Sequence, residues 1–178
     1  MHKRIAVLVT YDFEDVEYIE PVEAFRAARH SIINIEEQVG KIVYGMKRQS
    51  QITIDQSIDD ASVHEFDALF IPGGFSPDKL ALDDRFLYFV RHFADSQKPI
   101  LTSCHGPLLL LEAGVVKGRH LANIQTLNED LLEAGAVLSD LPVVNDCNLY
   151  ITSRSTSDTP KFIDVCLQVL GQPHPPIQ

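Results

Sequence analysis

The sequence predicts a single doubly wound α/β domain, in which helices cover both faces of a mostly parallel, flavodoxin-like sheet. Short, continuously apolar segments, typical of strands buried on both faces, alternate along the chain with segments of helical spacing. The chain has 178 residues, 45% of them hydrophobic, and no internal repeat, which is enough apolar material for one core. We expect this domain to span residues 1–171 and a Pro-rich tail to occupy residues 172–178.

The expected elements follow one another in strand–helix order. We expect buried strands at 4–10, 31–36, 67–71, 99–103 and 149–153, and a hairpin formed by 42–44 and 51–54. We expect helices at 14–29, 84–95, 106–113, 127–134 and 160–170. In the first helix, Pro21 must start or kink the helix, and the spacing predicts one shared face for Val16, Ile19, Ala24, Phe25 and Ala28.

Composition and charge exclude several classes of protein. The formal net charge of −10 disfavours binding to nucleic acid, because an acidic surface repels phosphate backbones. No apolar run is long enough to span a membrane, and the N-terminal apolar run is too short for a signal peptide, so we expect a cytoplasmic protein. The sequence has neither zinc-spaced Cys/His pairs nor a dinucleotide-binding glycine pattern, and we expect no metal and no cofactor.

The segment that indicates chemistry surrounds Cys104. A buried strand ends at Ser103 and a helix begins near Gly106, which predicts that Cys104 lies on a sharp turn where open α/β sheets bind their ligands. Gly106 permits the turn, and Pro107 is tolerated in the first helical turn because its missing N–H costs nothing there. The start of that helix favours a thiolate and an oxyanion. The pattern is typical of a nucleophile elbow, here with cysteine.

A free cysteine is by default a small buried hydrophobic residue, and this interpretation competes with the catalytic one. The strand–Cys–His–Gly–Pro–helix context favours catalysis for Cys104. The other two cysteines lack it: Cys166 lies in an apolar helix and is expected in the core, and Cys147 lies in an Asn/Asp turn and is expected to be structural. Three cysteines cannot all pair within one chain, which fits a reducing compartment.

Four stretches carry a resemblance to the PfpI-type intracellular protease family. They are Phe13-Glu14-Asp15-Val16-Glu17 followed by Pro21, Ile71-Pro72-Gly73-Gly74-Phe75-Ser76-Pro77-Asp78, Cys104-His105-Gly106-Pro107, and Thr152-Ser153-Arg154. Their order and spacing fit from about residue 4 to residue 171. The family shares a superfamily with the Parkinson-associated deglycase and has the class I glutamine amidotransferase-like fold. The resemblance implies homodimers or hexamers.

The resemblance also implies roles for residues of the first helix and the elbow. Cys104 would be the nucleophile, and Glu17 would share a proton with its sulfur, lowering the pKa of the thiol and raising that of the carboxyl. Glu14, one turn before Glu17, would reach the same cleft. The alternative is a solvated acidic helix start, and for Asp15 and Glu20 we prefer that interpretation.

The resemblance implies further roles around His105. This residue would be the general base or acid, oriented by a carboxylate of a neighbouring subunit, and Asp78 occupies the matching position. The alternatives are a surface histidine and, for Asp78, a cap of the helix after Pro77. Gly73 and Gly74, together with the N–H of His105, would supply backbone donors for an oxyanion. The alternative for the two glycines is a simple turn.

Three stretches depart from the family pattern. Thr102-Ser103 replaces a common Ala-Ile before the cysteine, and a hydroxyl there could hydrogen-bond the thiol or alter the pocket. Ser155-Thr156-Ser157-Asp158 replaces a Pro-Asp-Asp pattern, and the segment 120–125 also diverges. These departures bear on substrate choice more than on fold.

The resemblance implies three activities: peptide hydrolysis, removal of methylglyoxal-type adducts from amino groups, and hydration of glyoxals to hydroxy acids. All begin with thiolate addition to an electrophilic carbon. We rank glyoxal or adduct chemistry above proteolysis, because an exposed cleft suits small aldehydes better than folded proteins. The substrate would thus be a small carbonyl compound, a glycated protein or a peptide, in a stress response. One alternative is a redox sensor that works through oxidation of Cys104 without turnover. Another, a silent assembly protein, is disfavoured because Cys104, His105, Glu17 and Asp78 occur together.

Overall fold

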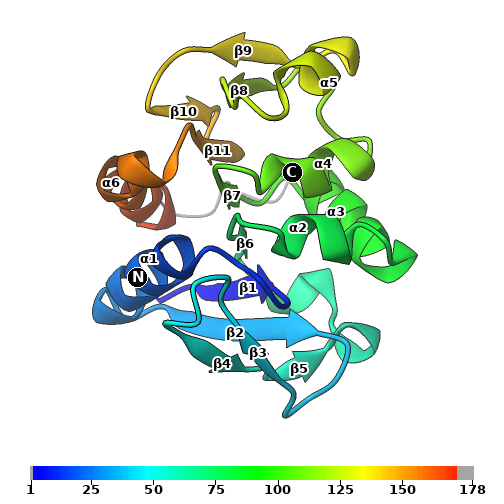
Figure 1. Cartoon of the computed structure of the whole chain (residues 1–178), viewed down its shortest axis with the longest axis vertical. Coiled ribbons are helices and arrows are strands. Elements are labelled where there is room, and N and C mark those ends of the chain that lie inside the picture. Colours follow the sequence, from blue (N-terminus) through cyan, green and yellow to red (C-terminus); the bar gives the residue numbers. More distant parts are fainter. Residues whose placement is uncertain (1, 172–178) are drawn as a thin grey trace.

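The computed structural model describes residues 2–171, and in it a central sheet lies between two layers of helices (Figure 1). The predicted tail at 172–178 lies outside the described residues. The sheet has the strand order β10-β11-β7-β6-β1-β2-β5, and every pairing is parallel except that of β10 with β11. Its strands are β1 (Arg4–Leu8), β2 (Ser31–Glu36), β5 (Gln56–Ser57), β6 (Ala68–Ile71), β7 (Ile100–Ser103), β10 (Val143–Asp146) and β11 (Tyr150–Ser153). The predicted doubly wound α/β fold is confirmed.

The helices are distributed over the two faces of this sheet. They are α1 (Asp15–Ala27), α2 (Ser76–Leu80), α3 (Asp84–Asp95), α4 (Pro107–Glu112), α5 (Asn128–Glu133) and α6 (Thr159–Leu170). Two small sheets complete the described fold: the antiparallel hairpin of β3 (Ile42–Tyr44) with β4 (Gln51–Thr53), and the parallel pair of β8 (His120–Ala122) with β9 (Val137–Ser139). None of the helices within residues 2–171 is long and apolar enough to cross a membrane.

The sheet separates two hydrophobic cores because successive side chains of a strand point to opposite faces. In β1, Ile5 and Val7 belong to the core that also contains Phe162 of α6, whereas Ala6 and Leu8 belong to the core on the side of α3 and α4. All four side chains of β1 named here are fully buried. Because β1, β6 and β7 are parallel neighbours, their carboxyl ends lie together at one edge of the central sheet, which two packed cores hold in place.

The first helix differs from its predicted packing. Its buried apolar residues are Tyr18, Val22 and Phe25, spaced i, i+4 and i+7, so of the face predicted from the sequence only Phe25 is buried. Pro21 lies inside the helix, six residues after its start, and so does not begin it. The physical reason is that the acidic residues Asp15 and Glu17 are themselves buried, which turns this side of the helix toward the protein.

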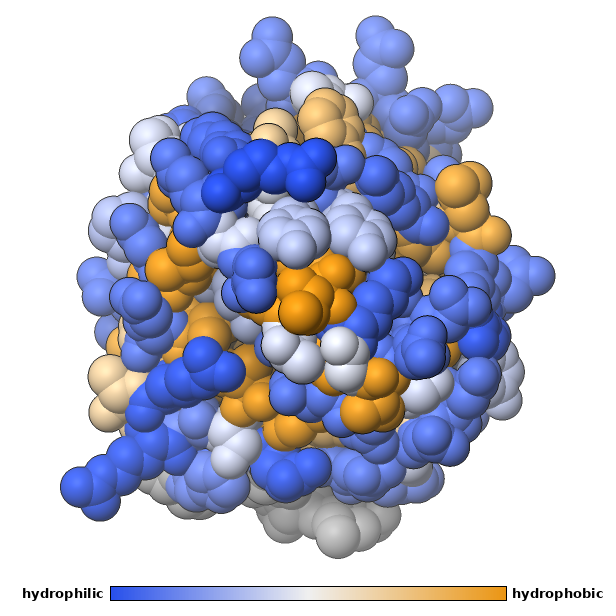
Figure 2. Space-filling model, turned by 60° about the horizontal axis from the view of Figure 1, so that its bottom comes forward, coloured by the Kyte–Doolittle hydropathy of each residue, from blue (hydrophilic) through white to orange (hydrophobic). Residues whose placement is uncertain are grey.

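The end of the molecule that carries the β3–β4 hairpin is mostly hydrophilic, with small groups of apolar residues between the polar ones (Figure 2). The hairpin and the loops beside it contribute the exposed side chains of Val39, Ile42, Tyr44 and Met46. Scattered apolar residues of this kind are ordinary on protein surfaces and do not define an interface. Assembly into a homodimer or hexamer therefore stays a prediction.

Candidate active site

Cys104 lies on a strained turn between β7 and α4. Its φ is +45°, in the left-handed region that non-glycine residues rarely adopt. Its N–H lies 3.2 Å from both the carbonyl oxygen and the hydroxyl of Ser153, at the end of the neighbouring strand β11. Gly106 N–H donates to the Ser103 carbonyl at 2.7 Å, and a Cβ on Gly106 would come within 2.7 Å of the Ile71 carbonyl. The predicted elbow is therefore formed.

The Glu17 carboxylate lies against this elbow. The residue is 1% exposed, and its two oxygens each accept one hydrogen bond: Oε1 from Gly73 N–H at 3.1 Å and Oε2 from the Thr156 hydroxyl at 2.5 Å. A Cβ on Gly73 would lie 2.2 Å from Glu17 Oε1 and 3.3 Å from the amide nitrogen of His105. Only glycine at position 73 thus lets the carboxylate approach the elbow this closely.

This contact corrects the oxyanion role predicted for Gly73. Because its N–H already donates to Glu17, Gly73 positions the carboxylate instead of an oxyanion. Gly74 has a φ of +81°, and a Cβ there would lie 2.5 Å from the amide nitrogen of Glu14. The pair of glycines is therefore required for close packing of this turn against the start of α1. The alternative of a simple turn does not account for this packing. Gly74 and His105 remain the candidate backbone donors.

Burial raises the pKa of the Glu17 carboxyl to about 7, against an ordinary value of 4.5. The hydrogen bond from Thr156 lowers this pKa, the charge of Glu14 raises it, and the Gly73 N–H and the charge of Lys47 lower it. The carboxyl can therefore both take up and release a proton near neutral pH.

The Cys104 thiol has a raised pKa, and the prediction of a lowered one is wrong. Burial, followed by the negative charge of Glu17, raises the pKa of the thiol to about 11, although the N–H of His105 acts in the opposite direction. The start of α4 does not outweigh these two effects. When Glu17 is charged, the proton of the pair therefore resides on sulfur, and the carboxylate is placed to accept it.

Glu14 reaches the same region, as predicted. It is 6% exposed, and its charge raises the pKa of both Glu17 and Cys104. Lys47, from the β3–β4 hairpin, places its Nζ 3.0 Å from Glu14 Oε1. Within the described residues, Oε2 of Glu14 has no hydrogen-bond partner. The hairpin thus contributes a cation to a site that otherwise carries two buried carboxyls.

Asp15 is not the solvated residue that the sequence predicts. It is 0% exposed and accepts hydrogen bonds from the N–H groups of Lys47 and Gln49, at 2.8 and 3.1 Å, and from the Ser50 hydroxyl at 2.7 Å. Burial alone would raise the pKa of this carboxyl, but the three donors outweigh it and lower the pKa below 3.8. Asp15 therefore fixes the hairpin loop that carries Lys47. Glu20 is exposed, as expected.

We expect the substitution Asp15→Asn to destabilise the protein by about 1–3 kcal/mol, because a buried amide cannot accept from all three donors. This corresponds to a Tm lower by roughly 3–10 °C for a chain of this size. Since the pKa of Asp15 is lowered on folding, its contribution is present above pH 3.8 and is lost as the pH falls below that value. Thermal unfolding at neutral pH measures the difference, with the exposed Glu20→Gln as a control. An equal Tm for both variants would contradict the role of Asp15.

His105 pairs with Asp78 within the chain. Its Nε2 lies 3.0 Å from Asp78 Oδ1, and its Nδ1 lies 3.1 Å from the Thr126 hydroxyl. Asp78 of the same chain can therefore orient the ring, and a contribution from a neighbouring subunit, which the resemblance implied, stays a prediction. Asp78 lies inside α2, which begins at Ser76, so it is not the cap of that helix. The sequence contained no signal for Thr126.

The hydroxyls beside the elbow form no bond to the thiol. Thr102 and Ser103 are buried, and neither hydroxyl has a hydrogen-bond partner among residues 2–171. Of the two possibilities that the sequence left open for this pair, the hydrogen bond to the thiol is therefore not formed. Of the other cysteines, Cys166 is fully buried in the core, as predicted, and Cys147 lies exposed in a turn with a φ of +56°.

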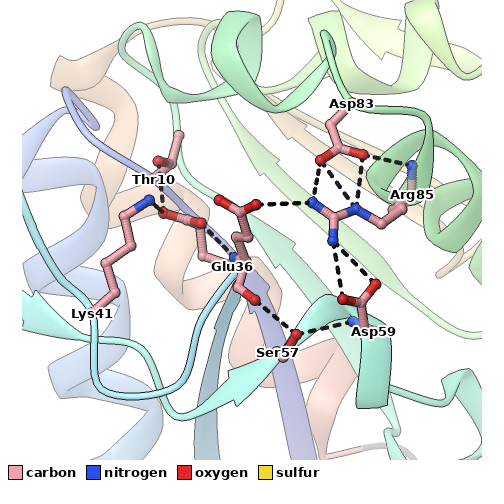
Figure 3. Close-up of polar contacts among 8 residues, drawn as sticks. Thr10, Glu36, Lys41, Ser57, Asp59, Asp83 and Arg85 are labelled. Atoms are coloured by element: carbon pink, nitrogen blue, oxygen red, sulfur yellow. Dashed lines mark hydrogen bonds and ion pairs between the residues drawn. The ribbon is translucent and has the colours of Figure 1, made fainter.

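A second polar cluster lies at the carboxyl ends of β1 and β2 (Figure 3). Glu36, 4% exposed, accepts from the Thr10 hydroxyl at 3.2 Å and from Lys41 Nζ at 2.6 Å. Beside it, Arg85 at the start of α3 contacts Asp83 at 2.6 Å and Asp59 at 3.1 Å. Because each member contacts another protein group, the cluster ties strands, loop and helix together. No sequence motif predicted this cluster.

These features define a class of protein, a doubly wound α/β protein with a cysteine-centred site. The particular family follows from comparison with known proteins: the chain belongs to the DJ-1/PfpI family, whose model matches residues 3–169. It is 47% identical over 171 residues to protein/nucleic acid deglycase 2 of Escherichia coli K12. The matched region covers 96% of this chain and 99% of that protein. It is 42% identical over 170 residues to a Bacillus subtilis protein named "Putative cysteine protease YraA", with coverage of 96% and 99%.

A solved structure shows the same fold. A two-domain protein from Anabaena variabilis, with DJ-1/ThiJ/PfpI-like and ferritin-like domains, superimposes with a TM-score of 0.91 at 30% identity. The match covers 95% of this chain and 48% of that one, so the chain spans about half the length of that two-domain protein. The family resemblance predicted from the four sequence stretches is thus confirmed.

Proposed function

We propose that this protein is a cysteine-dependent hydrolase or lyase that acts on small electrophilic carbonyl compounds, namely glyoxals and their adducts with amino groups. The observation that carries this proposal is that the buried Glu17 carboxyl, whose pKa is about 7, lies against the elbow of Cys104, and that its charge acts on the thiol. Such a carboxyl is matched to proton transfer near neutral pH. The names of the two curated relatives, a deglycase and a cysteine protease, support thiol chemistry of this kind.

The first step is addition of the thiol to the carbonyl carbon. As the bond from Cys104 Sγ to that carbon forms and the carbonyl π bond breaks, the thiol proton passes to the Glu17 carboxylate, which returns it to the new oxyanion. Glu17 is the acceptor, because both ring nitrogens of His105 lie at hydrogen-bond distance from Asp78 and Thr126. The N–H groups of Gly74 and His105 would stabilise the oxyanion.

The later steps need no oxidant or reductant. For a free ketoaldehyde, the proton on the carbon bonded to sulfur moves to the neighbouring carbon and the hydroxyl proton moves to the oxygen of that carbon, which turns the hemithioacetal into a thioester. Water then cleaves the thioester to a 2-hydroxy acid and restores the thiol. For an adduct, Cys104 Sγ bonds to the carbon that carries the amine as the carbon–nitrogen bond breaks, and the amine leaves with a proton, for which the His105–Asp78 pair is the proposed donor. The resulting hemithioacetal then follows the same path to the 2-hydroxy acid. The sum is one molecule of water added per turnover.

The structure bears on the alternatives as well. A redox-sensor role depends on a low-pKa cysteine, and the raised pKa of the Cys104 thiol disfavours it. Proteolysis remains the second candidate function, and the name of the Bacillus subtilis relative is the observation that supports it. A cytoplasmic stress response in a homo-oligomer fits the carbonyl chemistry and is part of the proposal.

The test is turnover by the purified full-length protein of three substrates: methylglyoxal, the adduct of methylglyoxal with an N-acetylated amino acid, and a chromogenic peptide. We expect lactate from methylglyoxal, and loss of the adduct faster than its spontaneous dissociation in buffer. Adduct loss at only the spontaneous rate would restrict the activity to free aldehydes. Peptide cleavage without aldehyde turnover would overturn the carbonyl assignment in favour of proteolysis, and no turnover of any substrate would reject the enzyme.

A further inference from the structure

The hydroxyl of Thr156 occupies a position in the site that no sequence motif assigned. It donates to Glu17 Oε2 at 2.5 Å, while Gly73 N–H donates to Oε1 at 3.1 Å. Both oxygens of a buried carboxyl are therefore held by donors from two different parts of the chain. Donors on both oxygens favour the ionised form and restrict rotation of the carboxylate.

The geometry of Thr156 is itself fixed. Thr156 begins a 3-10 turn (Thr156–Asp158) that leads from β11 into α6, and its carbonyl accepts from the Thr159 hydroxyl at 2.7 Å. In the same turn, the Ser155 hydroxyl donates to Asp158 Oδ2 at 2.8 Å. A hydroxyl on such a turn is aimed before any substrate arrives, so little entropy is lost when it bonds Glu17.

The same short segment also holds the nucleophile. Ser153, three residues before Thr156, contacts the N–H of Cys104 through its carbonyl and its hydroxyl, both at 3.2 Å. Residues 153–156 thus contact both members of the proton-sharing pair, Cys104 at one end and Glu17 at the other. This segment overlaps the stretch 155–158, which departs from the family's Pro-Asp-Asp pattern, and neither proline nor an ionised aspartate has a hydroxyl to donate.

We propose that Thr156 is a positioning residue that holds the Glu17 carboxylate, through its hydroxyl, in the ionised form that accepts the thiol proton. This proposal rests on the proposed role of Glu17 as the base. It assigns a function to a departure from the family pattern. It also predicts that the pH range of this protein depends on one hydroxyl.

The other groups that act on Glu17 set the direction of the effect. Glu14, at the start of α1, raises the pKa of Glu17 through its charge, and Lys47 of the hairpin lowers it. Cys104 faces Glu17 from the elbow and carries a proton while Glu17 is charged. The Thr156 hydrogen bond lowers the pKa of Glu17 more than the charge of Lys47 does. Removing the hydroxyl therefore favours the protonated carboxyl.

The test is the titration of Glu17, followed by carbon-13 NMR of side-chain carboxyls in the full-length protein and assigned by the signal lost in Glu17→Gln. We expect Thr156→Val to move the midpoint upward by about one pH unit. The same change would lower kcat/KM for methylglyoxal about fivefold at pH 7, with recovery at higher pH. Thr156→Ser keeps a hydroxyl and should restore the wild-type midpoint.

Ser157→Ala is the matched control, because Ser157 lies exposed in the same turn and its hydroxyl contacts Ser155 instead of Glu17. Thermal unfolding of each variant checks that it folds. An unchanged midpoint in folded Thr156→Val would overturn the role of Thr156 and leave the proposed activity intact. A shifted midpoint in a protein that turns over no substrate would support Thr156 and reject the activity instead.

Discussion

Cys104→Ser is expected to reduce turnover of every substrate by at least ~10³-fold, because a serine hydroxyl is a far weaker nucleophile than a thiol. The fold should persist, since serine is nearly isosteric and can adopt the left-handed backbone of the elbow as well as cysteine does. Initial rates of methylglyoxal consumption measure the effect.

Cys147→Ser is the control for this loss. Cys147 also has a positive φ, +56°, but it lies exposed in the turn between β10 and β11, away from the elbow. We expect its substitution to change the rate by less than about twofold, as is usual for exposed positions. Turnover retained by Cys104→Ser would exclude Cys104 as the nucleophile.

Glu17→Gln is expected to lower turnover by roughly 10²–10⁴-fold, the usual contribution of a positioned general base. Glutamine has the same shape, and its carbonyl oxygen can still accept from Gly73, so the loss would reflect the missing base and not a collapsed site. Rates of Glu17→Asp, which keeps a carboxyl on a shorter side chain, separate the need for a base from the need for its position. Rates near wild type in Glu17→Gln would assign proton transfer to another group.

The same substitution has a pH-dependent effect on stability. The pKa of Glu17 is raised on folding, from 4.5 to about 7, so the folded protein binds more protons than the unfolded chain between these values. Stability is therefore lost as the pH rises through this window. Glu17→Gln carries no such loss, and its Tm relative to wild type should increase from pH 4.5 to pH 7. A constant difference across that window would mean that the carboxyl is not perturbed.

Much of the site could be predicted because its key residues sit in local patterns. The strand that ends at Ser103 and the Gly106-Pro107 pair predict the elbow without any long-range information. The short elements were harder: β5, β8, β9 and α2 have two to five residues each, too few for a periodic pattern. Their presence follows from pairing with distant segments.

The parts that sequence could not supply are contacts between distant residues. Thr156 is 139 positions from Glu17, and the hairpin loop that buries Asp15 starts some thirty residues later, so nothing local distinguishes Asp15 from the exposed Glu20. The direction of the Cys104 pKa was mispredicted for a related reason. The start of a helix is visible in the sequence, whereas burial and the charge of Glu17, which outweigh it, depend on packing.

The central claim is that Cys104 and Glu17 share one proton, and titration of the thiolate by its ultraviolet absorbance tests it most directly. The measurement uses the Cys147→Ser background, so that among the described cysteines only Cys104 and the fully buried Cys166 remain. With Glu17 intact, the thiolate should form with a pKa of about 11, and in Glu17→Gln it should form at a clearly lower pH, because the carboxylate charge is gone. Identical titrations in the two proteins would contradict the shared proton.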